Sequence, residues 1–411
     1  MAARTSAFRF KGKNEDLRAI GQKLNVAAIL EGSVQRSGNR VRITVHLTKA
    51  DAGLTLWSES YDRDVKDIFA VEDDIAAAVT SALQPKLLGR TAPPSSRTTN
   101  PETYQAFLQA RSFDRSFDSE SQQKALEYVN RAIQFDPNYA PAYALRGVMT
   151  AESGLMATMN LLTAMESSRR DADKAITLDP NLAAGYLALS ESQAMANWDW
   201  QGAEQSVRKA RELAPGDADV LVQGGFLEMS QGRLEDAAEL MTRGLALDPL
   251  APSKHLLLAQ DLRDLGRYEA ALAELEKALA LSPRQVWTHE TRGEVYLAQG
   301  RMAEARAEME NEPPGVWRDF GEALIYQALG RHQNSDADLA RLIAGHQNDA
   351  AFQIAQVYAY REELDQAFHW LDRARQQHDG GLGHLKADWL LKKLRSDPRY
   401  AQLVRELNLP A

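Results

Sequence analysis

The sequence predicts a mainly helical protein, in which an α-solenoid of stacked helical pairs follows a small α+β module. The first observation is a repeat: Ala214-Pro215, Asp248-Pro249 and Ser282-Pro283 fall 34 residues apart twice in succession, and Asp179-Pro180 precedes them by 35 residues. The second is that residues 1–90 do not follow this repeat and carry the alternation of apolar and polar residues that is typical of strands. The third is that no run approaches about 18 apolar residues, so no segment is expected to span a bilayer.

A period of 34 residues, made of two helices and a closing proline, is typical of tetratricopeptide repeats. In the unit that ends at Pro283, Gly266 makes the turn, and Ala271, Leu275 and Ala278 line the second helix. Such a unit cannot bury its apolar face alone and must stack on its neighbours. The stack forms a curved rod with a concave groove, and a groove is suited to holding a partner.

The composition of the chain changes along its length and predicts four parts. Residues 1–90 form the α+β module, and residues 91–99, Thr-Ala-Pro-Pro-Ser-Ser-Arg-Thr-Thr, have the composition of a linker. Residues 100–376 read as about seven helical pairs. The pattern fails at Gly380-Gly381-Leu382-Gly383, so residues 377–411 are expected to form a helical cap.

The module is expected to contain strands, turns and two helices. Turn signals at Ser37-Gly38-Asn39 and Asp51-Ala52-Gly53 separate the β-rich runs. In chain order we expect a strand at Ser6–Phe10, a helix at Asn14–Leu24, strands at Ala27–Gln35, Arg40–Leu47 and Leu54–Tyr61, and a helix from about Val65 with Ile68, Val71, Ile75, Val79 and Leu83 as its apolar stripe.

Two departures from the period predict changes in helix length. Asp136-Pro137 and Asp179-Pro180 are 43 residues apart, so the helices around residues 154–166 should be longer than the others. Glu312-Pro313-Pro314 comes early, which should shorten one second helix and bend the array. Both departures are interpreted as packing adjustments rather than sites.

Charge is distributed unevenly between the two parts. Residues 1–90 hold 14 Lys and Arg against 11 Asp and Glu, a net charge of +3, and the remaining residues hold 34 against 46, a net charge of −12. An acidic solenoid disfavours nucleic-acid phosphates and suits a cationic or amphipathic protein partner. The chain has no cysteine, which excludes disulfides and thiolate metal sites.

Motifs for catalysis are missing from the sequence. There is no Gly-x-x-x-x-Gly-Lys-Ser/Thr loop, no Gly-x-Ser-x-Gly elbow and no His-Glu-x-x-His. His378, Asp379 and His384 flank a glycine-rich turn and could touch a metal, but a solvated loop is the favoured interpretation. We therefore expect no enzymatic activity, no cofactor and no metal site.

Several segments carry a resemblance to known proteins: Arg4-Thr5-Ser6 to Phe10-Lys11-Gly12-Lys13, Leu30-Glu31-Gly32-Ser33-Val34, Leu56-Trp57-Ser58-Glu59, Tyr61-Asp62-Arg63, Asp67-Ile68-Phe69, Trp198-Asp199-Trp200-Gln201-Gly202-Ala203-Glu204 and Leu394-Arg395-Ser396-Asp397-Pro398-Arg399-Tyr400. Together they resemble a bacterial family with a TolB-N-like module followed by tetratricopeptide repeats. This arrangement occurs in adenylate/guanylate cyclase-like proteins and in winged-helix, membrane-anchored regulators similar to CadC. The resemblance implies architecture and no catalytic residue. Trp198 and Trp200, within one of these segments, are expected to be structural.

The resemblance also implies which residues line the groove, because the first helices of such repeats form its concave face. The Lys and Asn clamp of carboxylate-binding members is missing, since the corresponding positions hold Val222, Leu256 and Glu290. An aromatic, partly acidic groove suits an amphipathic helix or an extended apolar peptide. The expected partner-binding residues are Phe226, Met229, Gln260, Arg263, Trp287, Glu294, Trp317, Phe320, Gln327, Phe352, Gln356 and Tyr360.

The functional expectation is a regulatory scaffold that binds another protein. The alternative is the sensory or accessory region of a nucleotide cyclase-like or transcriptional regulator whose effector domain is absent from this chain. Family members usually begin this module with a further strand and helix, so we expect an unpaired sheet edge that other copies could use for self-association. The chain has no signal peptide in its first residues, which predicts a cytoplasmic location, or a periplasmic one within a membrane-anchored parent.

Overall fold

The structure is a computed structural model, and it describes residues 2–13, 15–38, 40–64, 75, 98–113, 119–155, 159–283 and 285–410. The chain divides into two compact units. One consists of residues 1–99 with 246–250, and the other of residues 100–245 with 251–411. Two expected segments lie outside the described residues. They are the helix from Val65, of which only Ile75 is described, and residues 91–97 of the linker.

The first unit contains a three-stranded antiparallel sheet in the order β1-β2-β3. The strands are β1 (Ala28–Ser37), β2 (Arg40–Lys49) and β3 (Leu54–Asp64), which confirms the three β-rich runs. The first hairpin pairs Val34 with Ile43, and the second pairs Ile43 with Tyr61. Val41 and Val45 of the predicted alternation are buried, because every second residue of a strand faces the same side.

Helix α2 (Leu17–Leu24) confirms the first predicted helix, although it begins three residues later than Asn14. It begins there because the Asp16 carboxylate accepts hydrogen bonds from Arg18 N at 2.8 Å and Ala19 N at 3.3 Å, which caps the first turn. Gly21 lets this helix approach the end of β2, since a Cβ there would lie 2.5 Å from Ala50 Cβ.

The predicted strand at Ser6–Phe10 is wrong, because this region begins with helix α1 (Arg4–Phe8). A strand is stable only when its backbone groups pair with a neighbour. In the described sheet, β1 pairs with β2 and β2 pairs with β3. Neither hairpin pairs with residues 6–10. An alternation of five residues is too short to distinguish a strand from one helical turn.

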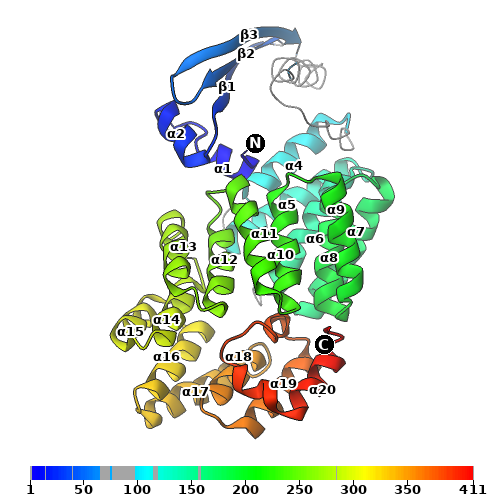
Figure 1. The fold of residues 1–411 in the computed structure, drawn as a ribbon. Coiled ribbons are helices and arrows are strands. Elements are labelled where there is room, and N and C mark those ends of the chain that lie inside the picture. Colours follow the sequence, from blue (N-terminus) through cyan, green and yellow to red (C-terminus); the bar gives the residue numbers. More distant parts are fainter. Residues whose placement is uncertain are drawn as a thin grey trace. The chain divides into compact units, whose positions relative to one another are not determined.

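The second unit consists of helices arranged in antiparallel pairs, as Figure 1 shows. The described residues contain eight pairs, where the sequence predicted about seven. The helices are α4 (Pro101–Phe113), α5 (Ser119–Phe135), α6 (Ala140–Leu155), α7 (Leu161–Leu178), α8 (Ala183–Asn197), α9 (Trp200–Leu213), α10 (Ala218–Ser230), α11 (Leu234–Leu247), α12 (Pro252–Asp264), α13 (Tyr268–Leu281), α14 (Thr288–Ala298), α15 (Met302–Asn311), α16 (Val316–Ala328), α17 (His332–His346), α18 (Ala351–Tyr360) and α19 (Leu364–Gln377).

Small residues set the spacing of these pairs. Ala271, Leu275 and Ala278 are fully buried on α13, as the repeat pattern predicts. The turns between paired helices contain Gly232, Gly266, Gly300 and Gly330, all with φ between 69° and 82°. Glycine adopts this left-handed conformation without the steric cost of a Cβ, so it ends the first helix of a pair sharply.

Both predicted changes of helix length are confirmed. Helix α7 has 18 residues, against 14 in α9 and α11, and α6 has 16. Helix α15 has only 10 residues, and it ends before Pro313. Proline lacks an N–H and clashes with the preceding turn, so α15 cannot continue through this segment.

The C-terminal segment, residues 378–410, contains the 3-10 helices η2 (Gly380–His384) and η3 (Lys392–Ser396) and helix α20 (Pro398–Glu406). Leu394, Leu403 and Leu407 pack in one apolar core with α18 and α19. The same core includes Trp200 and Val207 of α9, far earlier in the sequence. Within this unit, the end of the array therefore lies against α8–α10 (Figure 1).

Trp198 and Trp200 hold the C-terminal segment against the array. Trp200 is 4% exposed, and its Nε1 donates a hydrogen bond to Leu407 O at 2.7 Å. The Trp198 ring stacks on His378 with centroids 4.6 Å apart. Both tryptophans are structural, as the sequence analysis expected, but they join distant parts of the chain rather than adjacent helices.

Candidate functional site

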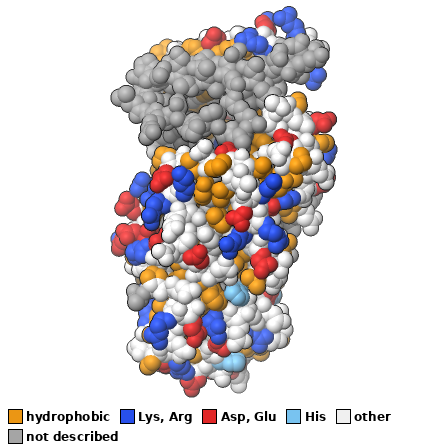
Figure 2. Space-filling view, turned by 90° about the vertical axis from the view of Figure 1, so that its right-hand side faces the viewer, with side chains coloured by type: hydrophobic (Ala, Val, Ile, Leu, Met, Phe, Trp, Pro, Cys, Tyr) orange, Lys and Arg blue, Asp and Glu red, His pale blue; other side chains and the backbone are white. Residues whose placement is uncertain are grey.

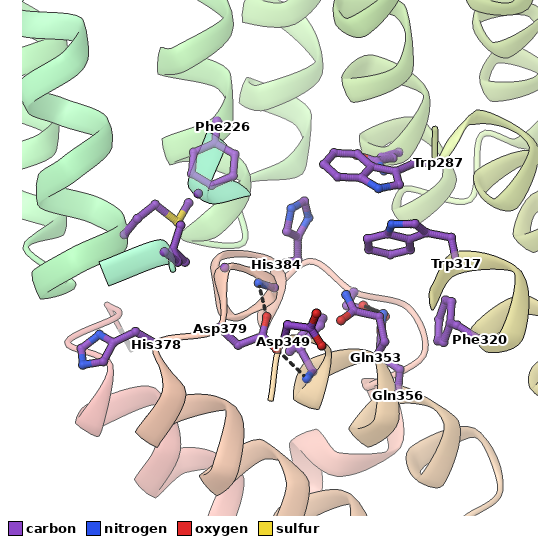
Figure 3. A pocket seen from close by; sticks show the side chains of 18 of the residues that line it. Phe226, Trp287, Trp317, Phe320, Asp349, Gln353, Gln356, His378, Asp379 and His384 are labelled. Carbon is purple, nitrogen blue, oxygen red and sulfur yellow. Dashed lines mark hydrogen bonds between the residues drawn. The ribbon is translucent and has the colours of Figure 1, made fainter. Parts of the chain in front are cut away.

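A cavity of about 430 Å³ lies between the inner helices of the array and the C-terminal segment. Even-numbered helices from α8 to α18 supply most of its wall. Residues from 377 to 388 supply another part, and Gly154, residues 159–161, Asn348 and Asp349 complete it. Figure 3 shows Phe226 on one side, Trp287 and Trp317 on the opposite side, and His384 between them. The groove expected from the sequence is therefore partly filled by the chain itself.

The structure brings nine of the twelve predicted groove residues to this cavity. They are Phe226, Gln260, Arg263, Trp287, Glu294, Trp317, Phe320, Phe352 and Gln356. Phe320 and Phe352 also belong to the main apolar core and are almost fully buried. Partner binding by these residues stays a prediction.

Three predicted residues lie elsewhere. Met229 is buried in a cluster with Ala387, Gln327 Oε1 is paired with His332 Nδ1 at 3.0 Å, and the Tyr360 ring packs edge-on against Trp389. None of the three is among the residues that line the cavity. Met229 and Tyr360 contact the C-terminal segment, whose position was not predictable from the repeat pattern.

Three aromatic side chains form one wall. The Trp287 and Trp317 rings meet edge to face with centroids 5.3 Å apart, and Trp317 meets Phe320 in the same way at 6.5 Å. Trp287 has a φ of 70°, a left-handed conformation that is strained for a large side chain. The buried Glu312 carboxylate holds this turn by accepting from Trp287 N at 3.2 Å and Glu290 N at 3.1 Å.

A buried ionic cluster lies beside the aromatic wall. Arg263 is 8% exposed, and its guanidinium donates to Asp264 Oδ1 at 3.0 Å and to Glu294. Trp389 Nε1 lies 3.5 Å from Glu294 Oε2, which ties the cluster to the C-terminal segment. Arg263 is the one Arg or Lys side chain among the described lining residues, which include six carboxylates: Glu191, Glu290, Glu294, Asp349, Asp379 and Asp388.

Burial changes the protonation of these acids. It raises the pKa of Asp388 to about 7, with a contribution from the Asp264 charge, and the pKa of Glu191 to about 7. Burial and the neighbouring Glu294 raise the pKa of Glu290 well above its usual range. A low dielectric disfavours the charged form of each acid, so near neutral pH the cavity holds more protons than the same acids would hold in water.

His378, Asp379 and His384 each lie against the helices of the array, and they do not form a metal site. His378 stacks on Trp198, and the Asp379 carboxylate accepts from Phe352 N and Gly381 N, both at 2.9 Å. Burial lowers the pKa of His384 to about 4, so this ring is neutral at pH 7. In the described part of the chain, no group of three or more His, Asp or Glu side chains is placed to hold a metal ion.

Sequence reasoning missed the part of the site that the C-terminal segment supplies. Asp379, His384 and Asp388 line the cavity together with the inner helices. The available signal was Gly380-Gly381-Leu382-Gly383. A Cβ at Gly381 would lie 2.4 Å from the Phe352 ring, so this glycine is needed for close packing against α18 rather than for a free loop.

The helical pairs form a solenoid of the tetratricopeptide-repeat type. The family model for the TPR repeat matches residues 259–300, which cover the second half of α12 together with α13 and α14. In the described residues, no helix is both long and apolar enough to cross a bilayer.

Two curated relatives match different shares of the chain. "Putative adenylate cyclase 3" of Rhizobium meliloti (strain 1021) is 38% identical over 144 residues, which are 34% of this chain and 24% of the relative. "Cellulose synthase 2 operon protein C" of Komagataeibacter xylinus is 29% identical over 233 residues, which are 53% of this chain and 18% of the relative. The chain therefore spans about a quarter or less of these relatives.

Solved repeat proteins show similar helical arrays at low identity. A thermophilic TPR protein of Thermus thermophilus is 18% identical, with a TM-score of 0.40, covering 47% of this chain and 99% of that chain. A tetratricopeptide repeat protein of Parabacteroides merdae is 14% identical, with a TM-score of 0.40, covering 65% of this chain and 98% of that chain.

Proposed function

We propose that the chain is a regulatory protein-interaction module whose repeat array holds a short segment of another protein on its concave face. The observation that carries this proposal is the C-terminal segment itself. Residues 378–391, which consist of the 3-10 helix η2 followed by turns, lie on the inner helices, with Ala387 packed on Met229 and Gln356 donating to Asp388. The concave face thus accepts polypeptide that is not α-helical.

The size and charge of the cavity indicate what kind of partner segment it suits. One turn of an α-helix, about 10 Å across and 5.4 Å high, occupies about 420 Å³. The cavity of about 430 Å³ therefore has room for a few extended residues rather than a long helix. Its aromatic wall and its excess of carboxylates favour a segment with apolar and basic side chains. On the face shown in Figure 2, charges of both signs are interspersed between apolar side chains, unlike the basic stripe that nucleic-acid binding requires.

A peptide-display selection on the full chain tests this proposal. We expect enrichment of short peptides that combine basic and aromatic or aliphatic residues. Trp317→Ala should weaken their binding by about tenfold or more, since a buried aromatic contact is often worth about 2 kcal/mol at an interface. Trp317 is suitable because it is only partly buried, whereas Phe352 belongs to the core.

Leu329→Ala is the matched control, because Leu329 is exposed and lies outside the cavity. Circular dichroism should show equal helicity in both variants. Equal affinity of the selected peptides for wild type and for Trp317→Ala would contradict the proposal.

The second candidate is the accessory region of a cyclase-like regulator. It is favoured by the 38% identity to the Rhizobium relative and by the TolB-N-like segments of the first unit. A cyclase or winged-helix segment in frame upstream of Met1 in the gene would support it. The chain alone should then not turn over ATP or GTP.

Self-association is proposed through the edge of the N-terminal sheet. Strand β1 is an edge strand of the described sheet, and its Leu30 and Val34 are 46% and 68% exposed. Exposed apolar edges pair readily with other chains. We expect the mass measured by light scattering to rise with protein concentration and Val34→Lys to remove this rise. A monomer at every concentration would contradict the proposal.

A further inference from the structure

The C-terminal segment meets the inner helices through buried polar groups as well as through its apolar core. Asp388 is 2% exposed, and its carboxylate accepts a hydrogen bond from Gln356 Nε2 on α18. Trp389 Nε1 lies 3.5 Å from Glu294 Oε2 on α14, and the Trp389 backbone N–H donates to the Asp264 carboxylate. The contact that holds the segment therefore includes ionisable groups, and its strength depends on which of them are charged.

Five ionisable residues at this contact form one buried group, which we call the closure cluster: Arg263, Asp264, Glu290, Glu294 and Asp388, each at most 8% exposed. The Arg263 guanidinium is the cation of the cluster, and it donates to Asp264 Oδ1 at 3.0 Å and to Glu294. In the described part of the chain, these two are the ion pairs of the cluster, and Glu290 and Asp388 have none. One guanidinium cannot neutralise four carboxylates in a medium of low dielectric, so the closed form keeps some of the acids protonated.

The contact between Glu290 and Glu294 requires one of these protons. The two carboxyl groups lie one helical turn apart on α14 and are hydrogen-bonded to each other. An ionised carboxylate has no donor, so this bond forms only when one of the two is protonated. Glu294 accepts from Arg263, so the proton belongs on Glu290. Burial, the charge of Glu294 and that of Glu312 raise the pKa of Glu290 well above its usual range, while Arg263 opposes the rise.

Asp388 holds a second proton, and His384 acts in the opposite direction. Burial raises the pKa of Asp388 to about 7; the charges of Asp264 and Glu294 add to this rise, and Arg263 opposes it. Burial and the Arg263 charge lower the pKa of His384 to about 4. An exposed histidine takes up a proton below about pH 6.5, so His384 favours opening in acid and contributes little above that pH.

We propose that the loss of protons from Glu290 and Asp388 opens the C-terminal segment, so that its closure over the array weakens as the solution becomes alkaline. Water solvates both acids in the open form, where they ionise at the usual carboxyl pKa of about 4. The closed form therefore binds more protons than the open form. The stability that these protons give the closed form is complete below about pH 4 and, for Asp388, is lost as the pH rises to about 7. This opening needs no protein partner.

A single introduced thiol can report this opening, because the chain has no cysteine. Ala387→Cys places it on the segment, at a residue that is 1% exposed and packs with Met229. The rate of labelling by a disulfide reagent is measured on the full chain from pH 6.5 to 8.5. It is divided by the rate for Ala307→Cys, an exposed position, to remove the titration of the thiol itself. Since each acid makes opening up to about tenfold more frequent per pH unit, we expect this ratio to rise at least about tenfold.

Glu290→Gln, combined with Ala387→Cys, assigns the rise to the closure cluster. Glutamine keeps a donor toward Glu294 but has no proton to lose, so the rise should fall below about fourfold, the part that Asp388 supplies. The further change Asp388→Asn should remove the remainder. Glu239→Gln is the matched control, because Glu239 is an exposed acid outside the cluster, and it should leave the rise unchanged.

A second reporter separates local opening from unfolding of the array. Ala132→Cys lies on α5, fully buried in a separate core, and its labelling ratio should stay constant over this pH range. If Ala387→Cys does not fold, as judged by circular dichroism, amide hydrogen exchange of residues 385–391 in the unmodified chain, relative to unstructured peptides at each pH, gives the same readout.

Three results would overturn the proposal. The first is a labelling ratio at Ala387 that does not rise with pH, and the second is a rise that Glu290→Gln leaves unchanged. The third is an equal rise at Ala387 and Ala132, since that would mean that the array unfolds as a whole.

Discussion

Replacing Arg263 with methionine should lower the free energy of unfolding by about 3–5 kcal/mol at pH 8, because the change leaves buried carboxylates without their partner. Arg263 is the cation that Asp264 and Glu294 contact inside the array. Methionine has a similar length and keeps most of the packing, so the loss measures the ionic contacts. Urea unfolding followed by circular dichroism gives the free energy.

The effect of Arg263→Met should become smaller as the pH falls from 8 to 5. Burial raises the pKa of Asp264, Glu290 and Asp388, and the Arg263 charge opposes this rise in all three. Without Arg263 these acids take up protons more readily. When the folded form binds more protons than the unfolded form, stability falls as the pH rises. The variant should therefore be least stable at high pH.

Arg233→Met is the control for this prediction. Arg233 pairs with Glu204 and Glu228, but all three side chains are more than a quarter exposed. An exposed pair contributes at most about 1 kcal/mol, and the change should show little pH dependence. A loss for Arg263→Met that is equal at pH 5 and pH 8 would mean that lost packing, rather than unpaired charge, causes it.

Replacing Trp200 with alanine should destabilise the array by about 3–5 kcal/mol, the usual cost of removing a large buried aromatic side chain. The change removes the hydrogen bond to Leu407 O and leaves a void in the main core. Trp200→Phe retains most of the apolar contact and loses the hydrogen bond, so it should cost only about 1–2 kcal/mol.

Hydrogen exchange distinguishes a local from a general effect of Trp200→Ala. Since Trp200 contacts the C-terminal segment, amides of α20 and of Leu407 should exchange faster than those of α4–α6, which belong to a separate core. Leu329→Ala, at an exposed position, should change stability by less than about 0.5 kcal/mol. Equally faster exchange in both regions would contradict the interpretation that Trp200 holds the C-terminal segment in place.

Local sequence was sufficient for much of the fold. The 34-residue period located most helical pairs, and turn signals located both hairpins. It was insufficient at Ser6–Phe10, where alternation over five residues predicted a strand and the structure has α1. Nine of twelve groove residues reached the cavity because repeat position fixes which side of a first helix faces inward.

The sequence by itself determined that this chain builds stacked helical pairs, because apolar spacing, small residues and closing prolines act between neighbours in the chain. Only the tertiary structure decided that the array closes on its own C-terminal segment. The contacts that close it join Trp200 to Leu407 and Glu294 to Trp389, about 100 to 200 residues apart, and depend on curvature accumulated over several repeats. The repeat period carries no information about this accumulated curvature. An open groove was therefore expected where the structure has an acidic and aromatic cavity that the C-terminal segment partly covers.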